Sequence, residues 1–295
     1  MTKPNFFIAG APRCGTTALY KYLRGHPSIF LPQLKEPHFF AADMRERRSF
    51  YTWTAGEYFA LFHEVTDNHL AIGEASVFYL YSSKALQEIY RFNHAAKIIV
   101  MLRNPVDLLA SLHSQMVYSS TESRIDFEKA WRENDLPDGR PCPAIETYRQ
   151  AGKLGACVER LYSIFPKHQV KIALLEDLQN SPKEVYEKIL RFLGVPSDHR
   201  NDFPKINKNK KIRIRALGRL TQRPPRPLWL PYRLASNLTG GRLHEVVKNV
   251  VRLNDVVVER KPVCPKLREE MVEVFSDDIE TLSSAINKDL SHWKS

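Results

Sequence analysis

The stretch "FFIAGAPRCGTTAL", residues 6–19, decides the fold that we expect of this chain. Its apolar start, residues 6–9, is bounded by Gly10, which is the pattern of a short buried strand. Residues 16–24 then follow the spacing of an amphipathic helix. A strand, a loop with two glycines and a helix, in this order, have the outline of a phosphate-binding loop.

The loop differs from that of nucleotide-hydrolysing enzymes, which carry Lys directly after the second glycine. Thr16 occupies the lysine position, and the nearest cation is Arg13 inside the loop. Backbone N–H groups at a helix start bind anions, and the hydroxyl groups of Thr16 and Thr17 add donors. Arg13 adds a planar cation with several donors. On this stretch alone, phosphate binding and an ordinary strand-to-helix turn are about equally well supported.

Similar strand and helix patterns recur along the chain. Residues 97–102, "KIIVML", and residues 169–176, "QVKIALLE", are typical of buried strands, and a helix pattern follows each. Asn104 and Pro105 suit the N-cap and first position of the helix after residue 102. Alternating strands and helices predict an α/β fold, a parallel sheet flanked by helices in a three-layer arrangement like that of P-loop nucleotide-binding proteins. Ligands of such sheets bind at the carboxyl ends of the strands.

Composition and length favour a single soluble domain over residues 1–295. No apolar run reaches the roughly 18 residues that span a bilayer, and the first residues lack the layout of a signal peptide. The four cysteines are scattered without CxxC spacing, which fits a reducing cytoplasm and favours neither a disulfide framework nor a metal site. The histidines are not spaced for a metal either and are more typical of packing or hydrogen bonding: His26, His38, His94 and His113.

The net charge of +11 is concentrated in one segment. Residues 203–244, the basic segment, contain eleven Lys and Arg and no Asp or Glu, and the rest of the chain is formally neutral. This pattern indicates an anionic partner at one place. A solvated charged face without a specific ligand is the alternative.

A second candidate anion site follows residues 97–102. Magnesium-dependent P-loop enzymes usually have Asp at the end of such a strand, but this chain has Arg103, which repels a cation and attracts an anion. Ser111 lies eight positions on, two helical turns away and near the same face. Alternatively, Arg103 caps a carbonyl group or pairs with Asp107.

Two such sites favour a ligand that is anionic at both ends and needs no metal, such as 3′-phosphoadenosine 5′-phosphosulfate (PAPS). At this point the chain resembles the PAPS-dependent sulfotransferases. "GAPRCGTTAL" is similar to their 5′-phosphosulfate loop, and "RNPVDLLASLHS" is similar to their 3′-phosphate motif. "LKEPHFF", residues 34–40, resembles the segment that carries the catalytic carboxylate in the glycan (heparan sulfate) branch. The resemblance extends over nearly the whole chain.

The resemblance implies roles for individual residues. The 5′-phosphosulfate would be held by loop residues, namely Arg13, Cys14, Gly15, Thr16 and Thr17. Arg103 and Ser111 would bind the 3′-phosphate, and Glu36 would be the general base that takes the acceptor proton. Arg13 would also stabilise the charge that builds on the leaving nucleotide. Lys210 and Arg213 lie where the family closes a loop over the nucleotide.

Three positions depart from the family pattern. Arg13 stands where Lys is usual, Ala75 replaces the lysine of an "EKS/T" motif, and Leu108 stands where Arg is frequent. Because an arginine does not readily give up a proton, Arg13 would act as an electrostatic stabiliser and not as an acid.

The leading interpretation is a PAPS-dependent sulfotransferase that acts on a hydroxyl or amine of a sugar, lipid or other small molecule. A P-loop kinase and a non-catalytic module for an anion or membrane surface are the alternatives. Residues 41–68 and 119–143 are expected to form the acceptor pocket, and 119–143 also looks like a surface excursion. The basic segment would bind the donor, the acceptor or a lipid surface. The C-terminal segment, residues 265–295, is expected to contain an amphipathic helix over residues 265–286.

Overall fold

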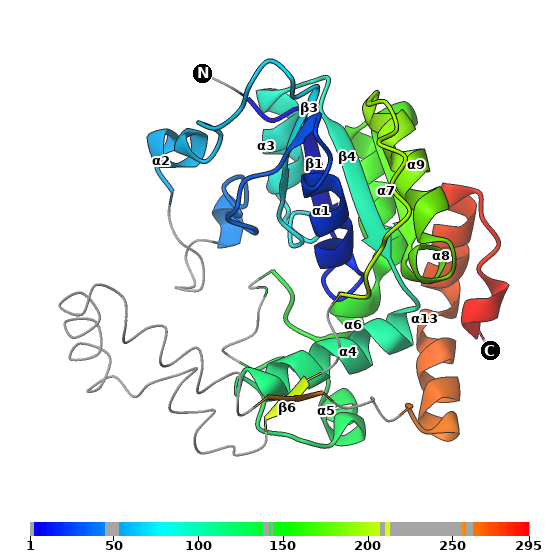
Figure 1. Cartoon of the computed structure of the whole chain (residues 1–295). Helices are drawn as coiled ribbons and strands as arrows, with labels where there is room; N and C mark the ends of the chain where they lie inside the picture. Colours follow the sequence, from blue (N-terminus) through cyan, green and yellow to red (C-terminus); the bar gives the residue numbers. More distant parts are fainter. Residues whose placement is uncertain are drawn as a thin grey trace.

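The computed structural model describes residues 3–44, 53–137, 142, 144–206, 210–212, 255–257 and 262–294. Its centre is a parallel sheet of five strands in the order β2-β3-β1-β4-β5 (Figure 1). The strands are β1 (Phe6–Gly10), β2 (Ile29–Phe30), β3 (Ala71–Ala75), β4 (Lys97–Leu102) and β5 (Val170–Leu174). The predicted α/β fold is thereby confirmed. The order reverses about β1, so the loop after β1 lies where ligands bind in such sheets.

Helices cover both faces of the sheet (Figure 1). On one face α1 (Thr16–Arg24) packs against α9 (Pro182–Leu193), and on the other α3 (Ala85–Phe92) packs against α7 (Leu154–Ile164). α4 (Pro105–Tyr118) crosses below the carboxyl ends of the strands, and α13 (Pro265–Ile286) packs against α7. The shorter elements are η1 (Ala42–Met44), α2 (Ala55–Ala60), α5 (Phe127–Glu133), α6 (Tyr148–Gly152), η2 (Lys167–Gln169), α8 (Leu175–Asn180), β6 (Lys210–Ile212), β7 (Asp255–Val257) and η3 (Ser291–Lys294).

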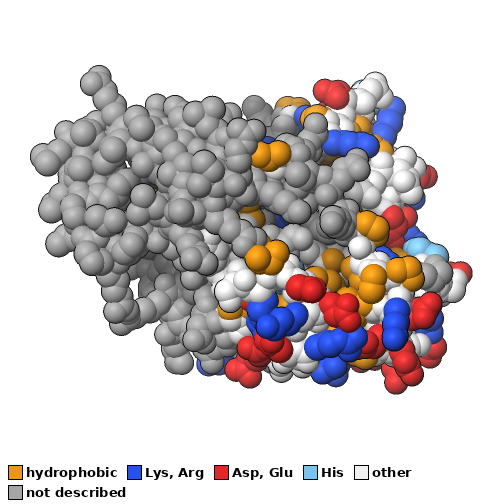
Figure 2. Space-filling view, turned by 90° about the horizontal axis from the view of Figure 1, so that it is seen from below, with side chains coloured by type: hydrophobic (Ala, Val, Ile, Leu, Met, Phe, Trp, Pro, Cys, Tyr) orange, Lys and Arg blue, Asp and Glu red, His pale blue; other side chains and the backbone are white. Residues whose placement is uncertain are grey.

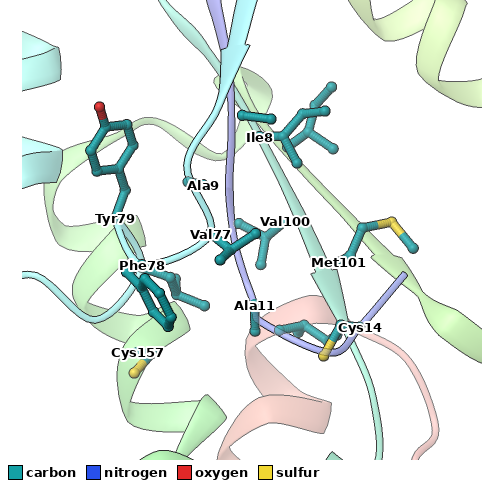
Figure 3. Packing of buried hydrophobic residues seen from close by; sticks show 14 of the residues in the cluster. Ile8, Ala9, Ala11, Cys14, Val77, Phe78, Tyr79, Val100, Met101 and Cys157 are labelled. Carbon is teal, nitrogen blue, oxygen red and sulfur yellow. The ribbon is translucent and has the colours of Figure 1, made fainter. Parts of the chain in front are cut away.

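The central strands are apolar because both of their faces are covered. Every residue of β1 is buried, as are the last five residues of β4. Figure 3 shows Ala11 and Cys14 of the loop in the same apolar cluster as Val100 and Met101 of β4. The core therefore continues up to the loop and supports it from one side.

Sequence reasoning missed β3, because its sequence "AIGEA" places a glycine and a glutamate inside a buried strand. Gly73 lies opposite Phe6 in the sheet, and a Cβ there would lie 2.3 Å from Cζ of the Phe6 ring. The side chain of Glu74 is buried against α2, where Tyr58 provides a hydrogen bond. Both residues are explained by neighbours that are distant in the sequence.

The prediction of a surface excursion over residues 119–143 was wrong for its middle part. This stretch contains α5, and Trp131 within it is fully buried. The indole N–H of Trp131 donates to Glu270 of α13 at 3.2 Å, and its ring lies 5.8 Å from that of Phe275. The apolar side of α5 thus packs against the C-terminal helix.

One predicted boundary shifts, and another is confirmed. The strand expected over residues 169–176 ends at Leu174, since α8 begins at Leu175 and buries Leu178. In the C-terminal segment, residues 265–295, the helix predicted over residues 265–286 is confirmed, and it ends at Ile286 because Asn287 adopts a left-handed conformation. After this turn the chain buries Trp293 in η3.

Candidate active site

The loop between β1 and α1 presents a row of backbone donors. Gly15 is the N-cap of α1 with φ of 84°, a conformation that favours glycine, and a Cβ there would lie 2.7 Å from Leu175 Cδ1. Among the described residues, no acceptor is found for the N–H groups of residues 14–17. Unpaired N–H groups at a helix start form an anion site, so the loop has the geometry that sequence analysis predicted.

Cys14 contributes its backbone and not its thiol. The side chain is fully buried, and its Sγ donates to the Pro12 carbonyl oxygen at 3.4 Å. Burial raises the pKa of the Cys14 thiol to about 12, so the group is not a nucleophile at neutral pH.

Arg13 joins the loop to α4. Its Nε donates to Ser111 Oγ at 3.0 Å, and its Nη1 donates to Gln115 Oε1 at 3.2 Å. Burial, and secondly the nearby Arg103, lower the pKa of Arg13, which nevertheless remains charged at neutral pH. The structure therefore brings together three predicted ligands from two strand ends: Arg13, Ser111 and Arg103.

Arg103 begins the connection from β4 to α4 and faces an acidic neighbour. Its Nη2 lies 3.9 Å from Asp107 Oδ2, the outer limit of an ion pair. Asp107 makes a much shorter contact with Arg268 of α13, at 2.6 Å. Pairing with Asp107, which sequence analysis left as an alternative for Arg103, is thus loose. No hydrogen bond from the Arg103 guanidinium to another described residue is found.

Glu36 lies at the same edge of the sheet. Its backbone N–H donates to Ala75 O at 2.9 Å, which places it at the carboxyl end of β3, the strand beside β1. Its φ of 67° is unusual for a residue with a side chain, and such strain concentrates at functional sites. The Glu36 carboxylate forms an ion pair with Lys35, and about a third of its side chain is exposed.

Several buried polar side chains hold the Glu36 segment through hydrogen bonds. The Ser76 hydroxyl accepts the His38 N–H at 2.9 Å, and the Tyr79 hydroxyl accepts the Phe40 N–H at 3.2 Å. Both hydroxyl groups lie near the Glu74 carboxyl group, which accepts a hydrogen bond from Tyr58 at 2.8 Å. Burial raises the pKa of Glu74 to about 7, although hydrogen bonds from these hydroxyl groups oppose the increase.

The structural reading of the histidines is confirmed for three of them by their hydrogen bonds. His26 accepts from the Ser28 N–H at 3.0 Å and donates to Pro196 O at 2.9 Å. His38 and His113 each bond a backbone carbonyl oxygen through a ring nitrogen, at 2.8 Å. His94 packs against the ring of Tyr90. The described residues contain no group of three or more His, Cys, Asp or Glu side chains that could hold a metal ion.

Of the two residues of the basic segment that were predicted to contact the donor, Lys210 and Arg213, the structure describes only Lys210. Lys210 begins β6, which pairs with β7 and lies beside α4, so the chain returns to the α4 side of the site. Arg213 lies outside the described residues, as does most of the basic segment. On the described part of the face seen in Figure 2, basic and acidic side chains are interspersed. No helix in the described ranges has the length and apolar character needed to cross a membrane.

Two residues of the site were missed in the sequence analysis. Gln115 follows Ser111 by four positions, which places both on one face of α4, and this spacing was a usable signal. Lys35 directly precedes Glu36, and no sequence pattern distinguishes its ion pair from a solvated lysine.

Comparison with known proteins identifies the family. The model of the "Sulfotransferase domain" family matches residues 3–212. Carbohydrate sulfotransferase 15 of Mus musculus is 28% identical over 291 residues, covering 77% of this chain and 49% of that protein. Bifunctional heparan sulfate N-deacetylase/N-sulfotransferase 3 of Homo sapiens is 26% identical, covering 65% of this chain and 22% of that protein. The chain thus spans about half, or less, of the length of these relatives.

A solved structure agrees over the full length. The crystal structure of a sulfotransferase from Alicyclobacillus acidocaldarius matches with a TM-score of 0.73 and 29% identity, and the match covers 100% of both chains. The family match includes the loop after β1, the Glu36 segment and the Arg103 connection, the three parts that form the site. This chain belongs to the sulfotransferase domain family.

Proposed function

We propose that the protein transfers the sulfuryl group of PAPS to a hydroxyl or amine group of a sugar, lipid or other small acceptor. The observation that supports this proposal is that two candidate anion sites and a carboxylate lie at the same edge of the sheet. Arg13 of the loop bonds Ser111 of α4, Arg103 lies near enough to Arg13 to lower its pKa, and Glu36 lies at the same sheet edge. PAPS has one anionic group for each site.

The residues present suit this donor. The N–H groups of residues 14–17 and the guanidinium of Arg13 bind the 5′-phosphosulfate, while Ser111 and Arg103 bind the 3′-phosphate. As the bond from sulfur to the bridging oxygen breaks, negative charge builds on the leaving 3′-phosphoadenosine 5′-phosphate (PAP). Arg13 and the helix N-terminus stabilise this charge without a proton transfer.

Glu36 acts on the acceptor. A neutral alcohol is a weak nucleophile, and a carboxylate within hydrogen-bond reach removes its proton as it attacks sulfur. In the structure Lys35 holds that carboxylate, so the acceptor must compete with Lys35 for Glu36. The backbone bond from Glu36 to Ala75 O holds the Glu36 segment at the carboxyl end of β3, beside the strand that leads into the donor loop.

The acceptor is proposed from the relatives, whose names place them among carbohydrate and heparan sulfate sulfotransferases. A glycan acceptor with hydroxyl and amine groups agrees with these names. The basic segment, with eleven cations, would suit a donor, an acidic acceptor or an anionic surface. A cytoplasmic location also remains a proposal, supported by four cysteines that are all unpaired.

The alternatives are less well supported. A magnesium-dependent kinase needs a loop lysine and an acidic strand end, whereas this chain has Thr16 and Arg103 in those places. A pure anion-binding module gains nothing from Glu36, because a carboxylate beside two anion sites opposes binding.

Turnover with defined donors tests the proposal. The protein is incubated with PAPS and a panel of acceptors that includes unsulfated and partly sulfated glycans, simple alcohols and amines, and PAP release is measured. The same panel with ATP and magnesium serves as the control. Acceptor-dependent PAP release supports sulfuryl transfer. Phosphorylated product with ATP and none with PAPS would contradict it.

A further inference from the structure

Three charged side chains, from α4, from α13 and from the connection between β4 and α4, meet beside the proposed 3′-phosphate site. Asp107 lies in the first turn of α4, with Arg103 four residues before it and Arg268 reaching it from α13. Arg268 Nη2 approaches Asp107 Oδ1 at 2.6 Å, whereas Arg103 Nη2 remains 3.9 Å from Asp107 Oδ2. The carboxylate is therefore shared unequally, in favour of Arg268.

An unshared Asp107 would harm a phosphate site at Arg103. A carboxylate this close to an arginine forms an ion pair with it, and the carboxylate also repels an incoming phosphate. The arrangement with Arg268 leaves one net positive charge in the group of three, while Asp107 and Arg103 alone would leave none.

A purely structural role explains the contact less well. All three side chains are partly exposed, with exposed fractions of 23% for Arg103, 38% for Asp107 and 28% for Arg268. Ion pairs at such exposure contribute about 0–1 kcal/mol to stability. Their electrostatic effect on a doubly charged phosphate nearby is the larger consequence.

We propose that Arg268 is a positioning residue that binds Asp107 and so keeps the Arg103 guanidinium available for the 3′-phosphate of the nucleotide. The C-terminal helix, which lies beyond the residues that hold the donor, thereby contributes to donor recognition. This inference rests on the proposed PAPS site.

Nucleotide affinities test it. Dissociation constants of PAP and of adenosine 5′-phosphate, which lacks only the 3′-phosphate, are measured by calorimetry. The dissociation constant of adenosine 5′-phosphate divided by that of PAP is the ratio that reports recognition of the 3′-phosphate. Arg268→Gln is expected to lower this ratio about fivefold, as estimated for loss of one partly screened charge. Adding Asp107→Asn to Arg268→Gln is expected to restore the ratio to within about twofold of the wild type, because the competing carboxylate is gone.

A matched control and a second variant complete the test. Arg132→Gln removes another ion pair to α13, with Glu270 at 3.2 Å, and should leave the ratio unchanged. Asp107→Asn alone should keep or raise the ratio, even if Arg268→Gln fails to fold.

Two results would overturn the inference while the proposed function stands. One is that Arg268→Gln weakens the binding of PAP and of adenosine 5′-phosphate by the same factor. The other is that adding Asp107→Asn to Arg268→Gln does not restore the ratio. If the wild-type protein binds PAP no better than adenosine 5′-phosphate, the proposed function fails and this inference fails with it.

Discussion

At the scale of single residues, the contacts of Arg13 explain why this loop carries an arginine where the family usually has lysine. Two nitrogens of one guanidinium reach two different acceptors on α4, Ser111 and Gln115. A lysine is a point charge on a flexible stem and cannot hold both in one fixed geometry. The partners lie 98 and 102 residues away in the sequence, so no local pattern predicted the contact.

Replacement of this residue gives the first prediction. Arg13→Lys keeps the charge but loses the fixed pair of hydrogen bonds, so we expect PAP affinity to fall about tenfold. Arg13→Ala loses the charge as well, so its affinity for PAP should fall further. Calorimetric titration with PAP measures both, and an Arg13→Lys variant that binds as tightly as the wild type would contradict this reading.

Glu74 gives a prediction about stability and pH. Its folded pKa of about 7 lies above the 4.5 of an unperturbed glutamate, so between these values the folded protein holds a proton that the unfolded chain has lost. The contribution of the buried Glu74 to the free energy of unfolding is therefore fully present below pH 4.5 and is lost as the pH rises through 7. The loss amounts to roughly 3 kcal/mol.

The variant Glu74→Gln should lack this dependence. Urea unfolding of the wild type and the variant from pH 4.5 to 8 should show the wild type losing stability relative to Glu74→Gln as the pH rises. The exposed Glu269→Gln is the matched control and should follow the wild type. A constant difference between the wild type and Glu74→Gln across this range would refute the assignment.

At the scale of elements, α7 and α13 pack with almost no space between their backbones. A Cβ on Gly155 would lie 2.3 Å from the Asp278 carbonyl oxygen. The Asp278 carboxylate also accepts the N–H groups of Gly155 and Ala156, at 2.7 and 3.0 Å, and so caps the start of α7. One small residue thus fixes how closely the C-terminal helix approaches the domain.

Gly155→Ala should therefore destabilise the fold by about 1–3 kcal/mol, the usual cost of overpacking. Gly56→Ala is the matched control, because a Cβ there meets nothing within 4 Å, and we expect it to be neutral or slightly stabilising. Denaturant midpoints measure both. Equal stability of the two variants would show that α13 does not pack this closely in solution.

Elements with regular local patterns were predictable. The bounds of α1 and β4 agree with the prediction, since their apolar spacing and flanking turns are local properties. β3 was not predicted, because a glutamate inside a buried strand is explained only by its hydrogen bond with Tyr58, a residue of another element. Trp131 was likewise placed on the surface, since the helix that buries it lies more than a hundred residues on.

At the scale of the whole molecule, the site is assembled from parts that lie far apart in the chain. The loop after β1, the Glu36 segment at the end of β3 and the Arg103 connection after β4 meet because parallel strands place their carboxyl ends at one edge. Sequence analysis predicted the individual residues and their shared edge. It could not predict how α13 adds Arg268 to that edge, since this depends on helix packing.

The central claim is that this edge transfers a sulfuryl group and does not merely bind anions. Glu36→Gln tests it most directly, because the change removes the proposed base and leaves the donor ligands in place. We expect the rate of PAP release from PAPS with a reactive acceptor to fall at least a hundredfold, while PAP affinity stays within about twofold of the wild type. Unchanged turnover in Glu36→Gln would contradict the account.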